Sequence, residues 1–171
     1  MSKQQSALTT ATLLFLTLLV SACGFALRGA HALPYESVYV SGADYAIITA
    51  GLKRAITASG AKVATNEKEA DAIFIPTAEF RQPVILSLSG SGRVREKRLV
   101  FSYSFRLVDK EGRDLIPKAT VQITRDISYS DSEILAKEQE EALLWRDMES
   151  DVVSQVMRRL SVKPYKKQEE Q

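Results

Sequence analysis

The stretch LVFSYSFRLV, residues 99–108, decides the fold, because apolar and polar side chains alternate along it. Successive side chains of an extended strand point to opposite faces of its sheet. One face of this stretch is therefore polar, with Ser102, Ser104 and Arg106 on it. The pattern predicts a strand whose other face is buried, and the residues on that buried face are Leu99, Phe101, Tyr103, Phe105 and Leu107.

Further extended segments flank this strand. Pro76 places one of them at a sheet edge or at a bulge, because proline cannot donate a backbone hydrogen bond. Residues 62–65 are too short a segment to assign. The predicted strands are Ser37–Val40, Asp71–Phe80, Val84–Leu88, Leu99–Val108 and Ala119–Ile127, with turns at Gly90–Gly92 and Lys110–Gly112.

The sequence also predicts two amphipathic helices. Asp44 is placed to cap the first, over Tyr45–Ser59, and Gly60 is placed to end it. The second runs roughly over residues 132–160, behind a capping box at residues 130–133. The apolar faces expected to pack on the sheet are Ile48, Leu52, Ala55 and Ser59 in the first helix, and Trp145, Met148, Val152, Val156 and Leu160 in the second.

These elements predict an α+β fold. Both helices are expected to cover one face of a mixed sheet of four strands, or slightly more, which gives a two-layer α/β sandwich. A chain of 171 residues is long enough for one core and too short for two comfortable domains. We expect that single domain over residues 37–162, followed by a disordered polar tail at residues 163–171.

The first 22 residues are predicted to be a lipoprotein signal peptide. The apolar run Leu8–Val20 is shorter than the roughly 20 residues that a membrane-spanning helix needs. The run leads into VSAC at residues 20–23, which resembles a bacterial lipobox, and Cys23 is the only cysteine of the chain. Cys23 is therefore the expected lipid-attachment site, and residues 23–36 are the expected acylated tether.

Composition narrows the chemistry that the chain could perform. One histidine, His31, and one cysteine leave too little material for a His-based triad, a multi-His metal site or an internal disulfide. The acidic residues Glu138, Glu140 and Glu141 are expected on the solvated face of the second helix. The 23 Lys and Arg nearly balance the 21 Asp and Glu, so net charge gives no support for a nucleic-acid partner. We expect no catalytic residues, no metal and no cofactor.

The basic segment RVREKR, residues 93–98, is the candidate ligand site. Arg93, Arg95 and Lys97 share parity with Leu99, so the apolar face of the strand becomes cationic toward its tip if no bulge intervenes. An apolar surface with a basic rim suits a ligand that carries both acyl chains and phosphates. The alternative is a solvated hairpin tip whose charges prevent edge-to-edge aggregation.

The sequence CGFALR at residues 23–28 is similar to the Cys-Gly-aromatic-x-Leu-Arg opening of the LptE family of lipopolysaccharide-assembly lipoproteins. The order of elements matches that family across nearly the whole chain after the signal peptide, including LAKE at residues 135–138. The polar tail is shorter than the tail of the family. Gly24 stands after the cysteine where an aspartate would retain a lipoprotein at the inner membrane, which implies the outer membrane.

The resemblance implies a lipid-anchored protein on the periplasmic side of the outer membrane. It would plug the LptD barrel, assist its assembly and bind lipopolysaccharide. Lys137 falls on a family position linked to lipopolysaccharide binding, and Arg93 or Arg95 substitutes for the family's loop arginine. The expected lipopolysaccharide-binding residues are thus Arg93, Arg95, Lys97 and Lys137.

Two rival hypotheses stand beside this one. The first is a periplasmic lipoprotein that binds another anionic amphiphile without a barrel partner. The second is a small envelope hydrolase, which the scarcity of histidine and cysteine disfavours.

Overall fold

The computed structural model describes residues 32–44, 46–129 and 134–162. Within these ranges the shorter elements come first, and three long strands and the longest helix follow. The elements in chain order are β1 (Ser37–Val40), α2 (Ile47–Ala58), β2 (Lys62–Val63), the 3-10 helix η1 (Glu67–Glu69), β3 (Ala72–Leu88), β4 (Val94–Val108), β5 (Asp114–Ser128) and α3 (Ile134–Leu160).

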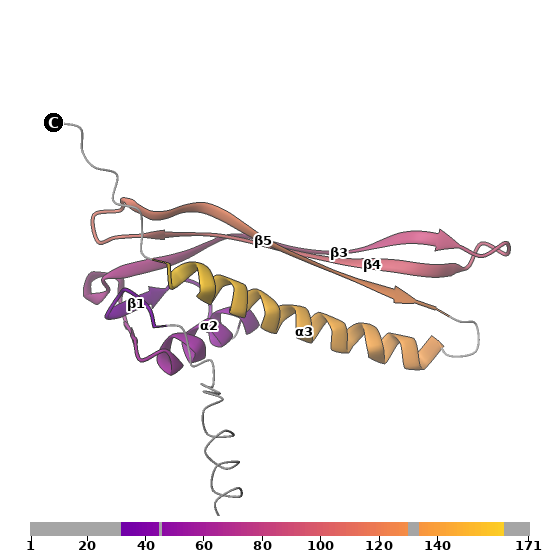
Figure 1. Cartoon of the computed structure of the whole chain (residues 1–171), viewed down its shortest axis with the longest axis horizontal. Helices are drawn as coiled ribbons and strands as arrows, with labels where there is room; N and C mark the ends of the chain where they lie inside the picture. The colour runs from indigo at the N-terminus through magenta and orange to yellow at the C-terminus, as the bar shows by residue number, and fades with distance from the viewer. Residues whose placement is uncertain (1–31, 45, 130–133, 163–171) are drawn as a thin grey trace, which may run out of the picture.

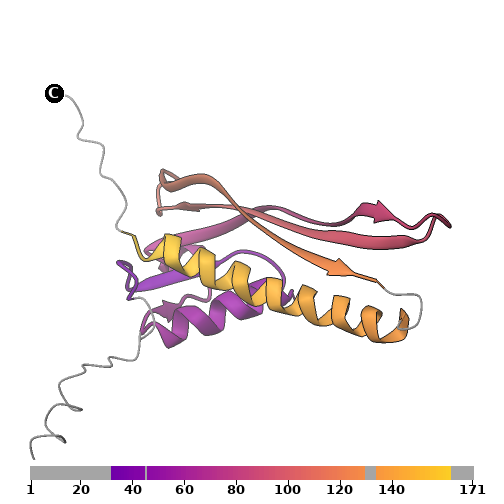
Figure 2. The same ribbon diagram turned by 45° about the vertical axis from the view of Figure 1, so that its right-hand side comes forward.

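The five strands form one mixed sheet in the order β2-β1-β3-β4-β5. β1 pairs in parallel with β2 and β3, whereas β3, β4 and β5 form an antiparallel meander. Both helices lie on the same side of this sheet, and the meander extends well beyond the short parallel strands (Figures 1 and 2). The predicted α+β two-layer arrangement is confirmed, with five strands.

β4 is the central strand of the core, as its alternation predicts. Leu99, Phe101 and Phe105 are fully buried on the helix-covered face, and Phe105 stacks on Phe74 of β3 with ring centroids 5.1 Å apart. Burial of such side chains contributes about 1.5–3 kcal/mol each, so this face supplies much of the stability of the domain. Arg106, on the opposite face, is exposed.

The strands of the meander are longer than the sequence analysis predicted. Residues 71–80 and 84–88 belong to one 17-residue strand, β3, which continues through Pro83. A register shift between Pro76 and Ala78 confirms the predicted bulge. β4 begins at Val94 and β5 at Asp114, because antiparallel pairing extends each strand beyond the residues that pack in the core.

The start of α2 differs from the prediction, whereas its end agrees. Ala46 occupies the N-cap position without a side-chain hydrogen bond, so the expectation that Asp44 caps this helix is wrong. Asp44 lies two positions too early for that role, and its carboxylate instead accepts a hydrogen bond from Lys53 at 2.5 Å. Gly60 follows the helix with φ of +88°, the left-handed conformation of a terminating glycine. The predicted capping box of the second helix lies outside the described residues.

α3 is held against the sheet by apolar and ionic contacts. Met148, Val152, Val156 and Leu160 are buried, as their spacing predicts, and Trp145 is half-buried against the core. An ion pair joins Arg81 of β3 to the largely buried Glu149 at 2.5 Å, while the Arg81 guanidinium lies 4.4 Å from the centre of the Phe101 ring. This pair was not foreseen, because its members are far apart in sequence.

Candidate functional site

The β3–β4 turn closes what we call the distal hairpin, residues 84–97, which extends past the start of α3 (Figure 1). The Ser89 amide donates to the Arg93 carbonyl at 2.7 Å, and the Gly92 amide donates to the Ser89 carbonyl at 2.9 Å. From Ile75 onward β3 pairs only with β4 among the described residues, so its other edge is open. The distal hairpin is therefore a two-sided projection beyond the helix-covered core.

Apolar side chains cover β3 in the distal hairpin. They are between 37% and 56% exposed, although large apolar residues in a core are fully buried. Four large exposed apolar residues within five positions indicate a candidate site of interaction with a protein, a lipid or a ligand. The residues are Val84, Ile85, Leu86 and Leu88.

The structure divides the four predicted cationic residues into two pairs. Arg93 lies at the end of the turn, where its amide donates to the Ser89 hydroxyl at 3.1 Å, and Arg95 follows in β4. Both of these side chains are exposed at the tip of the hairpin. Lys97 and Lys137 are only partly exposed and lie closer to the body of the domain.

Arg95 interrupts the alternation on which the predicted cationic face depended. Ser87 is opposite Glu96 and Leu88 is opposite Val94, so Arg95 is an extra residue in β4 relative to β3. Such a bulge breaks the strict alternation of side chains. Lys97 shares the face of Leu99, but the condition for placing Arg93 and Arg95 on that face, a strand without a bulge, is not met.

Lys97 belongs to a half-buried polar cluster between the sheet and α3. Its ammonium lies 3.3 Å from the Glu141 carboxylate and 4.6 Å from the centre of the Tyr129 ring. Tyr129 donates its hydroxyl to Glu141 at 2.5 Å, and the Trp145 indole donates to the same carboxylate at 3.4 Å. Lys137 lies one helical turn before Glu141 and pairs with Glu140 at 2.8 Å.

The cluster alters the protonation of its members. Burial alone would raise the pKa of Glu141, but hydrogen bonds from Tyr129 and Lys97 outweigh that effect and hold the pKa below its ordinary value. The hydrogen bond with Tyr129 is the main cause of the raised pKa of Lys97. Glu141 is thus no member of a solvated face, contrary to the sequence analysis, because a lysine 44 residues away pairs with it.

Replacing Glu141 with glutamine is expected to lower the free energy of unfolding by about 1–3 kcal/mol at pH 7, because charge-assisted hydrogen bonds are lost. A carboxyl whose pKa is depressed by folding stabilises the protein above its ordinary pKa of 4.5 and loses that contribution as the pH falls through the folded-state value. The difference between the wild type and Glu141→Gln should therefore shrink below about pH 4.5, as measured by urea unfolding.

Glu138 is the matched control for this substitution, since it is exposed on the same half of α3. Glu138→Gln should leave the stability unchanged within about 0.5 kcal/mol at every pH. Equal losses from the two substitutions would show that Glu141 is not held by the cluster.

Neither a metal-ligand cluster nor a membrane-spanning helix occurs among the described residues. No group of three His, Cys, Asp or Glu side chains in the described ranges is arranged to hold a metal ion. None of the helices within those ranges is both long and apolar enough to span a membrane. The exposed apolar and cationic side chains of the distal hairpin form the candidate site.

Comparison with solved structures places this fold among bacterial lipoproteins. An uncharacterized lipoprotein B from Nitrosomonas europaea, solved by solution NMR, is 37% identical, with a TM-score of 0.70, and the match covers 81% of this chain and 90% of that one. The rare lipoprotein B from Shewanella oneidensis shares the fold at 19% identity, with a TM-score of 0.64 and coverage of 73% and 93%. A minor lipoprotein from Acinetobacter baumannii does so at 20% identity, with a TM-score of 0.62 and coverage of 75% and 92%.

The family described as "LptE: Lipopolysaccharide-assembly" matches residues 35–160, which is most of the chain. The chain therefore belongs to the LptE family of lipopolysaccharide-assembly lipoproteins, as the resemblance in its sequence indicated. Comparison with curated protein sequences finds no match.

Proposed function

We propose that the chain is an outer-membrane lipoprotein that plugs an LptD-type barrel, assists its assembly and binds lipopolysaccharide on the way to the outer leaflet. Membership of the LptE family supports this role. Cys23 would carry the acyl anchor, and the folded domain would face the periplasm. Two or more acyl chains suffice to hold a protein on a membrane without a membrane-spanning helix.

The observation that carries lipopolysaccharide binding is the composition of the distal hairpin. Exposed apolar residues of β3 lie beside the exposed Arg93 and Arg95 at one tip. Lipopolysaccharide combines acyl chains with phosphates, and an arginine can bind two phosphate oxygens at once. Such a ligand would place its phosphates on the tip arginines and its acyl chains against exposed apolar side chains of β3, among them Ile85, which shares the face of Lys97.

Lys97 and Lys137 contribute less directly in this proposal. Both pair with glutamates of α3, so part of their charge is already compensated. They would extend the positive electrostatic potential from the tip toward the body of the domain, and neither would bind a phosphate by itself. The tip arginines are more exposed than these two lysines, and we expect them to dominate the affinity.

The double substitution Arg93→Ala, Arg95→Ala is expected to weaken binding of lipopolysaccharide by at least tenfold. Hydrogen bonds to charged groups contribute about 1.5–3 kcal/mol each, and about 1.4 kcal/mol corresponds to tenfold in affinity. Calorimetric titration of the purified protein with lipopolysaccharide would measure this loss. Affinity should also fall with salt, because exposed charges are screened over about 8–10 Å at physiological ionic strength.

Arg113 and Lys118 provide a control with the same change of charge. They lie on the β4–β5 hairpin, at the opposite end of the meander from the distal hairpin (Figure 1). Arg113→Ala, Lys118→Ala should leave affinity unchanged within about twofold, because exposed charges far from the ligand contribute little. If the two double variants bind lipopolysaccharide equally, the ligand site is not the distal hairpin.

A further inference from the structure

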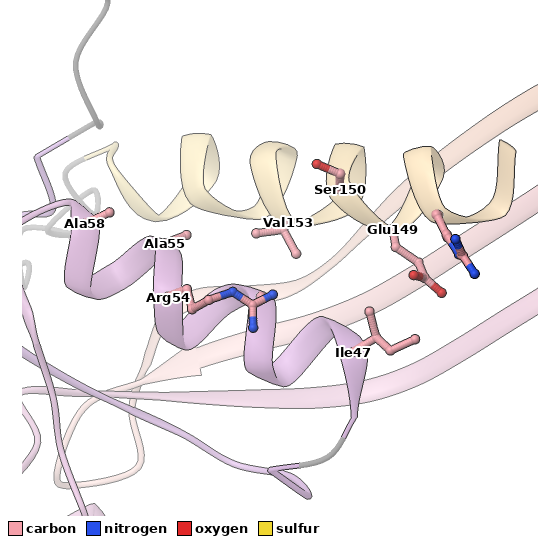
Figure 3. Close-up of a pocket in the computed structure, with 9 residues that line it drawn as sticks. Ile47, Arg54, Ala55, Ala58, Glu149, Ser150 and Val153 are labelled. Atoms are coloured by element: carbon pink, nitrogen blue, oxygen red, sulfur yellow. The ribbon is translucent and has the colours of Figure 1, made fainter. Parts of the chain in front are cut away.

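A second surface of the domain lies between α2 and α3, away from the distal hairpin. A groove of about 450 Å³ runs between these helices, and it is lined by side chains from both (Figure 3). Residue numbers increase in the same direction along the two helices, with Ile47 near Glu149 at one end and Ala58 at the other. The two helices are therefore parallel, and the groove follows their axes.

Small residues on α2 create this groove. Gly51 lies so close to α3 that a Cβ atom placed on it would come within 2.9 Å of Val153 Cγ2. Ala55 and Ala58 also line the groove, and their small side chains leave space between the two helices. At one end the large apolar side chain of Ile47 is 58% exposed. The groove is thus apolar along its floor and open to a partner.

Two arginines give the groove a net positive charge. The side chains of Arg54 and Arg146 line it, and among the described residues neither makes an ion pair or a side-chain hydrogen bond. Glu149, also in the lining, already pairs with Arg81 at 2.5 Å and does not neutralise them. Two guanidinium groups, one on each helix, that pair with no carboxylate in the described part of the chain are complementary to an acidic partner.

The spacing of the arginines defines the partner further. Arg146 precedes Val153 by two turns and Arg54 follows Gly51 by nearly one, so their Cα atoms are offset by about 15 Å along the parallel axes at 1.5 Å per residue. The Arg54 side chain leans back toward Ile47, which shortens the gap between the two charges (Figure 3). Cα atoms seven residues apart on a helix are separated by about 10.5 Å, so the glutamate and arginine side chains would span the rest of the offset.

We propose that the α2–α3 groove docks an acidic helix of a protein partner. A third helix would lie along the small residues of α2, cover Ile47 and Val153, and bring one carboxylate to each arginine. Grooves between helices bind amphipathic helices in this way, and arginine is among the residues that dominate such interfaces. The surface is separate from the distal hairpin, so docking there does not depend on lipopolysaccharide binding.

The test uses the full chain purified in a non-ionic detergent and a fluorescein-labelled, alanine-based helical peptide of 18 residues. The peptide carries two glutamates seven positions apart, with one leucine between them on the same face, and a twin peptide carries lysines instead. Fluorescence anisotropy should show that the glutamate peptide binds the wild type. The variant Arg54→Glu, Arg146→Glu should bind the glutamate peptide at least tenfold more weakly than the wild type does. The same variant should bind the lysine peptide better than the wild type does.

Arg158→Glu, Arg159→Glu is the control, because both arginines are exposed on the last turn of α3 outside the groove. This variant should bind the glutamate peptide within twofold of the wild type, and circular dichroism should show that all variants are folded. Equal binding by the groove variant and the control overturns the proposal. The absence of binding at 1 mM peptide also overturns it, because a dissociation constant above 1 mM corresponds to a binding free energy weaker than about 4 kcal/mol. Arginine-dependent binding of dihexanoyl phosphatidylglycerol without peptide binding also overturns it, and assigns the groove to a phosphate.

Discussion

Phe101→Ala is expected to lower the free energy of unfolding by about 3–5 kcal/mol, which is the usual cost of removing a buried phenylalanine. Phe101 is fully buried at the centre of β4. Its ring meets the Trp145 ring edge-on, with centroids 6.4 Å apart, and its face receives the Arg81 guanidinium at 4.4 Å. The substitution therefore leaves a cavity and also removes an aromatic contact and a cation–π contact.

Urea unfolding followed by circular dichroism would measure this effect. Ser102→Ala is the control, since Ser102 is the next residue of β4 and points to the opposite face of the sheet. Its effect should stay within about 0.5 kcal/mol. A loss below about 1 kcal/mol for Phe101→Ala would contradict the assignment of this face of β4 to the core.

Cys23→Ala is expected to abolish acylation and to leave the chain unprocessed or released from the membrane. The thiol of Cys23 is the only one in the chain, and it follows the lipobox-like VSA directly. Without it no group can take the diacylglycerol, and the stabilisation of about 0.8 kcal/mol for each buried methylene is lost. Metabolic labelling with an alkyne palmitate, followed by fractionation of membranes, would report both effects.

Ser21→Ala serves as the control for this experiment, because alanine keeps the residue before Ala22 small. This variant should be labelled as strongly as the wild type. Equal labelling of Cys23→Ala and the wild type would show that the lipid is attached elsewhere or not at all.

The core of this fold could be predicted because its signals are local. The alternation of β4 and the helical spacing of Met148, Val152 and Val156 each arise within a single element. These two patterns are enough to place a sheet under a helix layer. The length of β3 was underestimated, since Pro76 and Pro83 resemble strand ends in sequence, whereas a bulge and an open edge accommodate them in the structure.

The candidate site was only partly predictable, because much of it depends on contacts between distant segments. Exposed Arg93 and Arg95 follow directly from the charge pattern of the hairpin. The partners of Lys97 do not, because Tyr129 and Glu141 reach it only after β5 and α3 have packed on β4. The bulge at Arg95 is equally invisible in one strand, since register is a property of a pair of strands.

The groove between α2 and α3 illustrates the same limit. Gly51, Ala55 and Ala58 are ordinary small residues in an amphipathic helix when the sequence is considered alone. Only the approach of Val153 gives Gly51 its role, and only the pairing of Glu149 with Arg81 leaves the positive charge of the groove uncompensated.

Affinity purification of the tagged full-length chain from membranes in a mild detergent, followed by mass spectrometry, tests the proposed function most directly. We expect an LptD-type barrel to co-purify in an amount comparable to that of the chain, together with bound lipopolysaccharide. The tagged Cys23→Ala chain should recover far less of the barrel, because it is not held at the same membrane. Recovery of the acylated chain with lipopolysaccharide but without any barrel would contradict the plug role and would favour a lipoprotein that binds an anionic amphiphile alone.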